Sequence, residues 1–165
     1  MKISKGKEIL VLRFNNYKSW NFIEEHQKLI EANGDVWILK GGRPITATRI
    51  NEIMEDGVGF LVLKEPKKDG GNYYIASIDK IVTDDPTPGM KYPSYYNDML
   101  YDYDCLAIES LYGTWIHIKE IVPLSNEVIK HLHLLSNNKL LDPVLSSTRS
   151  SMLFAMPDIE LSIKE

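Results

Sequence analysis

The sequence has a single cysteine, Cys105, among its 165 residues. One cysteine forms neither a disulfide within the chain nor a cysteine-based metal site, which is typical of proteins of the reducing cytoplasm. Long apolar runs are also lacking, because the run from Ile9 to Leu12 that follows the basic start ends at Arg13. We therefore expect neither a signal peptide nor a membrane-spanning segment, and we expect a cytoplasmic location.

The motifs of common catalytic sites are missing as well. The sequence contains no Gly-x-Ser-x-Gly nucleophile elbow, no phosphate-binding loop, no zinc-binding His-Glu-x-x-His and no dinucleotide glycine fingerprint. The pairs Asp84–Asp85 and Asp102 with Asp104 could bind a divalent ion, but acidic pairs beside prolines and tyrosines are more often solvated loop. We predict a protein without catalytic activity, bound metal or cofactor.

Positive charge is in deficit. The chain carries 19 Lys and Arg against 23 Asp and Glu, a net charge of -4 at pH 7. Proteins that coat nucleic acid nonspecifically depend on many contacts from Lys and Arg to phosphate, so this charge argues against that class. It remains compatible with a pocket that recognises one nucleotide.

The sequence does have enough apolar residues for one full core, since 44% of it is hydrophobic. We predict a single domain over residues 1–165, with a core at about 8–154 and a loosely held acidic tail at 155–165.

Apolar periodicity and turn residues predict the order of the elements. Strands are expected at 8–14, around Trp37, and at 58–63, 72–82, 105–112 and 114–122. Helices are expected after Ser19, in the stretch that carries Ile50 and Ile53, and, as the last long one, after Ser125. Because the middle strands adjoin through hairpins, we predict an α+β fold, in the form of a small curved mixed or antiparallel β-barrel with flanking helices.

Three histidines fall in these predicted helices. His26 shares the apolar face of the first one, where we expect a packed, hydrogen-bonded residue and not a ligand. His131 and His133 are two apart in the last helix, so they should point to different faces and form no metal pair.

The stretch from Asn33 to Arg43 combines several features of a ligand-binding site. It contains Trp37, the glycine pair Gly41–Gly42, and Lys40 and Arg43 on either side of that pair. Glycines let a backbone approach a ligand closely, cations bind phosphate, and a tryptophan offers a flat stacking face. The stretch is either the mouth of a binding pocket or an ordinary helix, strand and turn with a core tryptophan.

A second candidate wall is the segment from Thr83 to Tyr103. It has three prolines and the tyrosines Tyr92, Tyr95, Tyr96, Tyr101 and Tyr103. A long irregular loop within a compact domain is usually functional or disordered, and its aromatic residues favour order. The alternative is a loop pinned to the core by its tyrosines.

The order of these features resembles the PUA-like superfamily, and within it the EVE and YTH-type modules associated with restriction and phage-defence proteins. The resemblance spans about residues 8–154. It rests on the helix ending at Asn33–Gly34, the strand that follows through Trp37 to Gly41, the tyrosines at 92–96, the strand with Trp115, and the Ser/Arg-rich loop 146–151.

The resemblance implies a small barrel that holds a modified or flipped base of DNA or RNA in an aromatic pocket. Matched residue by residue, Trp37, Tyr95, Tyr96 and Trp115 are the candidate aromatic residues. Lys40 and Arg43 would bind phosphate beside Gly41, and Arg149 with Ser150 would supply hydrogen bonds at the rim. Trp115 lies in a strand where a core role is equally compatible with its sequence.

Two other classes stay open. One is a protein-interaction module, an accessory or inhibitor protein of a defence system, that uses the acidic, tyrosine-rich segment 84–104 as its surface toward an effector protein. The other is a small-molecule or nucleotide-binding enzyme whose site has no sequence signature. The sequence leads us to expect the nucleobase-binding module.

Overall fold

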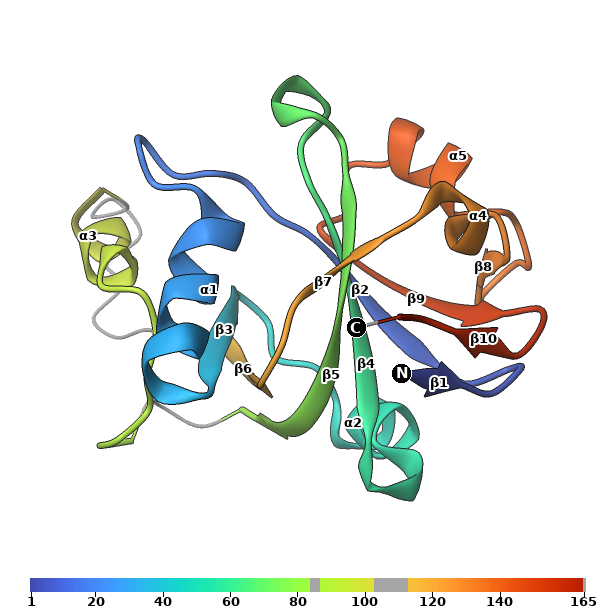
Figure 1. The fold of residues 1–165 in the computed structure, drawn as a ribbon, viewed down its shortest axis with the longest axis horizontal. Helices are drawn as coiled ribbons and strands as arrows, with labels where there is room; N and C mark the ends of the chain where they lie inside the picture. The colour runs from blue at the N-terminus through green and yellow to red at the C-terminus, as the bar shows by residue number, and fades with distance from the viewer. Residues whose placement is uncertain (84–86, 103–112, 165) are drawn as a thin grey trace.

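The computed structural model describes residues 1–83, 87–102 and 113–164, which form an α+β fold around a mixed sheet (Figure 1). Its helices are α1 (Phe22–Asn33), α2 (Ala47–Ile53), α3 (Tyr95–Asp102), α4 (Asn126–Ile129) and α5 (Leu141–Ser147). Its strands are β1 (Lys2–Ile3), β2 (Ile9–Arg13), β3 (Val36–Gly41), β4 (Gly59–Lys64), β5 (Tyr73–Val82), β6 (Gly113–Ile118), β7 (Val122–Leu124), β8 (Leu132–Leu134), β9 (Met152–Pro157) and β10 (Leu161–Ser162). The predicted α+β class is confirmed.

The main sheet has the strand order β3-β6-β5-β4-β2-β9-β8, and β7 pairs with β5 beyond the end of β6. Strands β2 and β4 are parallel, and the other neighbours are antiparallel. A separate two-stranded sheet joins β1 to β10. Because one pair is parallel and the rest are antiparallel, the sheet is mixed, as expected. The pairings of the described strands form an open path from β3 to β8, and they do not close the sheet into a barrel.

Strands β2 and β4 lie in the centre and are buried on both faces, which explains their nearly continuous apolar sequences. Val11 and Val62 face a core completed by α4, α5 and the small β1–β10 sheet. Leu10 and Leu61 face the opposite core, which α1 and α2 cover. Successive residues of a strand point to opposite faces, so one run of sequence supplies both cores.

A third cluster is aromatic and lies on the outer face of β3 and β6. Trp115 and Leu39 are directly paired across these strands, and Tyr95 and Tyr96 of α3 pack over them. Ile116 points to the opposite face of β6, as its alternation with Trp115 predicts.

The structure corrects the prediction for the tyrosine-rich segment. Residues 95–102 form α3, where the sequence suggested an irregular loop. Tyr95 and Tyr96 are only 3% and 4% exposed, so their packing against the sheet stabilises this helix. The pair Asp84–Asp85, Asp104 and the predicted strand 105–112 lie outside the described residues.

The N-terminus of α1 also differs, because Asn21 and not Ser19 is its cap. The Asn21 side chain accepts a hydrogen bond from the backbone N–H of Glu24 at 3.0 Å, and Asn16 accepts one from Phe22 at 2.9 Å. The predicted end of the helix is confirmed, since Gly34 has the left-handed φ of 84° and its N–H bonds to Ile30.

The predicted last long helix is wrong. Only the single turn α4 forms, and the chain then extends into β8, whose Leu132 and Leu134 are buried beside β9. The predicted strand 114–122 is interrupted, because β6 ends at Ile118 and a separate strand, β7, begins at Val122. The end of the chain is not loose as expected: β10 pairs with β1, and Leu161 and Ile163 are buried.

None of the helices in the described parts of the chain is long and apolar enough to cross a membrane.

Candidate functional site

Two adjoining hollows open beside the end of β2. We call the first the tyrosine hollow, which has a volume of about 250 Å³. Its polar and aromatic lining comes from Arg13, Asn15, Asn16, Tyr17, Lys40, Tyr95 and Tyr96, and its apolar lining from Leu12, Phe14, Phe22, Ile38, Leu39, Leu63 and Met99. Among the described residues, this lining includes two cations and no carboxylate, which makes it suited to an aromatic or anionic ligand.

The second, which we call the hairpin hollow, has a volume of about 700 Å³. Its lining comes from the β4–β5 hairpin loop, the end of β2, and α5 with the loop that follows it. The two hollows share Arg13, Phe14 and Asn15, so they adjoin at the end of β2, and we call the two together the groove. Five cations line this groove against two carboxylates, whereas the whole chain has a net charge of -4.

Tyr96 is held in the tyrosine hollow by a buried hydrogen-bonded chain. His26 of α1 donates from Nδ1 to the Phe22 carbonyl at 2.7 Å, which leaves its Nε2 to accept the Tyr96 hydroxyl proton at 2.5 Å. The Tyr96 oxygen also accepts the Leu39 N–H at 3.4 Å. This chain links α1, α3 and β3, and it confirms that His26 is a packed, hydrogen-bonded residue.

Burial determines the protonation of this pair. It lowers the pKa of His26 to about 4, against a smaller opposing effect of the hydrogen bond to Phe22. It raises the pKa of Tyr96 well above its usual value, with Tyr95 adding to the rise. Both groups are therefore neutral near pH 7, and their role is to position α3 and the wall of the hollow.

A layer of three nearly parallel rings borders the same wall. Tyr17 and Trp20 lie with ring centroids 6.1 Å apart at 9°, and Tyr95 lies about 6 Å from each at 18°. Tyr17 and Trp20 come from the segment before α1, which an isolated β-bridge between them closes into a tight turn. Tyr17 and Trp20 are only half-buried, so part of this aromatic surface is accessible to a ligand.

Lys40 lies at the end of β3 on the rim of the tyrosine hollow. Its Nζ donates to the Gly41 carbonyl at 2.8 Å, and burial lowers the pKa of its ammonium group. A partly desolvated cation gains more from an incoming anion or acceptor than a fully hydrated one. Of the cations predicted from the sequence, Lys40 is therefore the one best placed to contact a ligand in the tyrosine hollow.

The structure does not bring the nine sequence-predicted residues into one pocket. Lys40, Tyr95 and Tyr96 line the tyrosine hollow, and Arg149 lines the hairpin hollow. The remaining five line neither hollow: Trp37, Gly41, Arg43, Trp115 and Ser150.

Two of these five have clear structural surroundings. Trp115 is 0% exposed and packs against Tyr92 and Tyr96, so it is a core residue, as the alternative interpretation of its strand had it. Trp37 packs on His117, with ring centroids 4.6 Å apart, and His117 bonds to the carboxylates of Asp35 and Asp79. These carboxylates make the surroundings of Trp37 unfavourable for phosphate.

Sequence reasoning missed most of the groove. Of its residues outside the predicted set, Arg13 was recognised only as the end of an apolar run, and Asn15, Asn16, Lys64 and Lys67 were assigned no role. One signal was present: a cation and two amides directly after a buried strand, where a chain leaves a sheet and side chains often meet a ligand.

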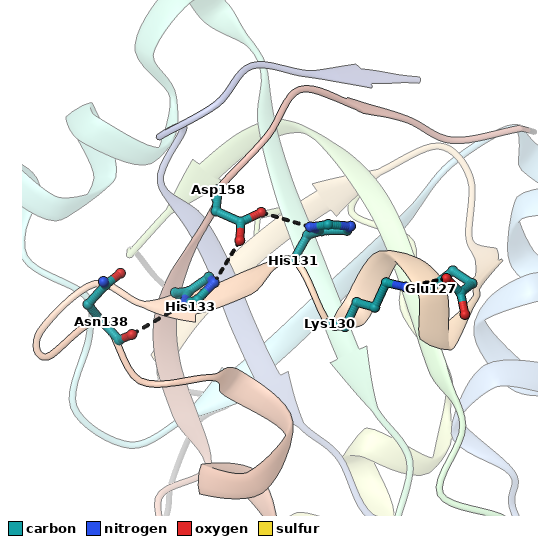
Figure 2. Close-up of polar contacts among 6 residues, drawn as sticks. All are labelled: Glu127, Lys130, His131, His133, Asn138 and Asp158. Carbon is teal, nitrogen blue, oxygen red and sulfur yellow. Dashed lines mark hydrogen bonds and ion pairs between the residues drawn. The ribbon is translucent and has the colours of Figure 1, made fainter.

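Outside the groove, a polar cluster that we call the histidine clamp joins β8 to the end of β9 (Figure 2). His131 Nδ1 and His133 Nε2 lie 2.8 Å and 2.9 Å from the two oxygens of Asp158, and His133 Nδ1 lies 3.1 Å from the Asn138 carbonyl. The expectation that the two rings point to different faces is wrong, because residues two apart in an extended segment share a face.

The clamp favours a charged His133. Both of its ring nitrogens face acceptors, so only the imidazolium can donate to both. The hydrogen bonds to Asn138 and then to Asp158 accordingly raise the pKa of His133. For Asp158, burial opposes ionisation, but the hydrogen bonds from both histidines outweigh it and lower the pKa of the carboxyl group.

No group of three or more His, Cys, Asp or Glu within the described ranges is arranged to hold a metal ion. The chain matches no protein-family model, and no curated protein or solved structure is significantly similar to it. The resemblance to the PUA-like superfamily therefore stays a prediction from the sequence.

Proposed function

We propose that the protein is a non-catalytic module that binds a modified or flipped nucleobase of DNA or RNA in the tyrosine hollow. One observation carries the proposal: aromatic rings, two cations and two amides converge there, and none of the lining residues that the structure describes is a carboxylate. Aromatic side chains stack on bases, and Asn side chains can pair with the edge of a base. Cations at the rim complement the adjoining phosphate.

The size of the hollow supports a single base as the ligand. Its 250 Å³ is just below the range of roughly 300–1,000 Å³ that is common for sites of drug-sized ligands. Extruding a base from its stack costs a few kcal/mol, and stacking on an aromatic side chain returns roughly 1–3 kcal/mol. Hydrogen bonds from Asn15 and Lys40 would supply the remainder and the selectivity, because the Asn16 side chain is already bonded to Asp69 and to the Phe22 N–H.

The proposal includes the finer expectations from the sequence. These are a PUA-like barrel, a cytoplasmic setting in keeping with the single Cys105, and an effector protein as a possible partner. A protein-interaction module is the rival class. Tyr95 and Tyr96 of its expected surface are buried, so their rings are not open to a partner, whereas Tyr17 in the lining of the hollow is half-buried and can stack on a base. We therefore favour the nucleobase ligand.

Fluorescence anisotropy with labelled single-stranded, mismatched and duplex oligonucleotides, with and without modified bases, tests the proposal. We expect one base or modification to bind most tightly at physiological salt. Lys40→Ala should weaken that binding about tenfold, because it removes a charge-assisted hydrogen bond of about 1.4 kcal/mol. Tyr17→Leu should weaken it by roughly 5- to 150-fold through the loss of 1–3 kcal/mol of stacking.

Arg43→Ala is the matched control, since Arg43 is an exposed cation near Lys40 in sequence that does not line the hollow. Its affinity should stay within twofold of the wild type. Thermal melts establish that each variant is folded. Equal losses in Lys40→Ala and Arg43→Ala, or no preference among the bases, would contradict a base-specific hollow and favour the rival class.

A further inference from the structure

The hairpin hollow gathers four cations from separate segments of the chain. Arg13 ends β2, Lys64 ends β4, Lys67 lies in the hairpin loop and Arg149 follows α5. Such convergence of like charges is unfavourable in the free protein, since each cation repels the others. A hollow that maintains it is suited to an anion.

The carboxylates that line the hollow do not neutralise these cations by direct pairing. Glu65 accepts hydrogen bonds from the backbone and side-chain N–H groups of Asn72, and Asp142 accepts the hydroxyl proton of Tyr73 at 2.5 Å. None of the four cations forms an ion pair with any residue that the structure describes.

Two of the cations are held in place by the backbone. Arg13 donates from Nη1 to the carbonyls of Thr148 and Ser150, which leaves other guanidinium N–H groups for a ligand. Lys64 donates to the Gly71 carbonyl and lies 4.1 Å from the centre of the Tyr73 ring. They are therefore oriented before a ligand arrives, while the exposed Lys67 and Arg149 can close on it.

The protonation of Lys64 agrees with this picture. Burial lowers the pKa of its ammonium group, and Arg13 and Lys67 lower it further against the opposing effect of Asp142 and Glu65. An anion between these cations would reverse that effect and stabilise the charged form.

We propose that the hairpin hollow binds the phosphodiester groups next to the base in the tyrosine hollow, so that the ligand is a nucleic-acid strand and not a free nucleoside. This inference rests on the proposed function, because it assigns a second subsite for the same ligand. The hollows share Arg13, Phe14 and Asn15, so they adjoin at the end of β2, as neighbouring subsites for one strand would. Arginine and lysine commonly contact the phosphates of a strand, and these contacts give its register.

The test compares a labelled single-stranded oligonucleotide with the matching free nucleoside, its triphosphate and inorganic tripolyphosphate as competitors. The variant is the double substitution Lys67→Ala with Arg149→Ala, both at exposed positions. We expect its oligonucleotide affinity to fall at least tenfold at physiological salt. Its plot of log affinity against log salt should become shallower by about 1.4, which is about 0.7 for each lost phosphate contact on a single strand. Nucleoside binding should stay unchanged.

Lys68→Ala is the control, because Lys68 is the neighbouring exposed cation of the same loop and does not line the hollow. It should leave both the affinity and the salt slope within error of the wild type. An equal change in Lys68→Ala and in the double variant would overturn the inference in favour of a diffuse charge effect.

The remaining outcomes separate this inference from the proposed function. Wild-type affinity and slope in the double variant, together with weaker binding in Lys40→Ala, would overturn the inference and leave the proposed function standing. Sensitivity to Lys67 and Arg149 without sensitivity to Lys40 or Tyr17 would support a backbone site and refute base recognition. Stronger competition by the triphosphate or tripolyphosphate than by the unlabelled oligonucleotide would overturn the strand in favour of a free phosphate compound.

Discussion

At the scale of single residues, the buried pair of His26 and Tyr96 shows how chemistry that resembles a catalytic site can be structural. An imidazole and a phenol at 2.5 Å could exchange a proton in an active site. Here the His26 ring is 0% exposed, and burial keeps both groups neutral. The pair instead fixes the place of α3 beside the tyrosine hollow.

The low pKa of His26 predicts a loss of stability in mild acid. The folded pKa of about 4 is below the ordinary value of 6.5, so the unfolded chain binds more protons between these pH values. The contribution is complete above pH 6.5 and falls by about 3 kcal/mol as the pH drops to about 4. Urea unfolding at several pH values measures it.

His26→Gln is the informative variant, because an amide can still donate and accept hydrogen bonds at this position. Its free energy of unfolding should be lower at pH 7, and the part of the acid sensitivity due to His26 should vanish. The same decline between pH 6.5 and 4 in both proteins would contradict the assignment.

At the scale of elements, the ladder between β3 and β6 depends on one glycine. Gly113 has φ of 151°, and a Cβ atom there would lie only 2.2 Å from the Lys40 carbonyl oxygen. Any side chain would therefore push the two strands apart where Lys40 enters the tyrosine hollow. Opposite it, Gly41 has open space around the position of a Cβ atom.

We predict that Gly113→Ala lowers the free energy of unfolding by roughly 1–3 kcal/mol through strain at this position. Gly41→Ala should change it by less than about 0.5 kcal/mol, although the two glycines are paired in the same ladder. Chemical denaturation of both variants provides the comparison. Similar losses for the two would show that the close approach at Gly113 is relieved in solution.

The elements that could be predicted are those whose own residues indicate their secondary structure, without help from a distant segment. β2 and β4 were expected because a strand buried on both faces needs a nearly continuous apolar run, and β5 was expected from its alternation. The end of α1 was expected because its glycine adopts the left-handed conformation. β8 was mistaken for helix because Leu132, His133 and Leu134 are decided by pairing with β9. Local propensity does not encode that pairing.

The candidate site was only partly predictable for the same reason. Lys40 and Arg149 were found by residue type, but the cations of the groove come from segments that are distant in sequence and meet only in the fold. Trp37 and Trp115 were predicted from residue type as well, but neither lines a hollow. In the sheet, Trp37 packs on His117, and Trp115 packs within the aromatic cluster.

At the scale of the whole molecule, the histidine clamp helps hold the end of β9 to β8, and so influences how the last strands close the fold (Figure 2). The raised pKa of His133 makes its contribution to stability complete below about pH 6.5 and lost as the pH rises through its folded value. The lowered pKa of Asp158 makes the contribution of that carboxylate present above its ordinary pKa near 3.8 and lost as the pH falls below it.

We therefore predict that Asp158→Asn lowers the melting temperature more at pH 6 than at pH 9. At pH 6 His133 is charged and loses its carboxylate partner, whereas at pH 9 it is neutral and loses less. The pKa of His133, followed by NMR, should fall in the variant. Asp142→Asn, which alters a carboxylate that does not contact these histidines, should leave that pKa unchanged. An equal loss of melting temperature at both pH values would contradict the role of the charged pair.

The parallel and antiparallel neighbours of β2 also determine how the chain can fold. Leu10 pairs on one side with Leu61 and on the other with Phe154, near the opposite end of the sequence. During synthesis, the edge of β2 that β9 will cover stays unpaired until the chain has been made as far as Met152–Pro157. At roughly 5–20 residues per second this exposes a strongly apolar strand edge for many seconds. Folding should therefore be slow for a chain of this size, and the nascent protein should depend on chaperones more than its compact final sheet suggests.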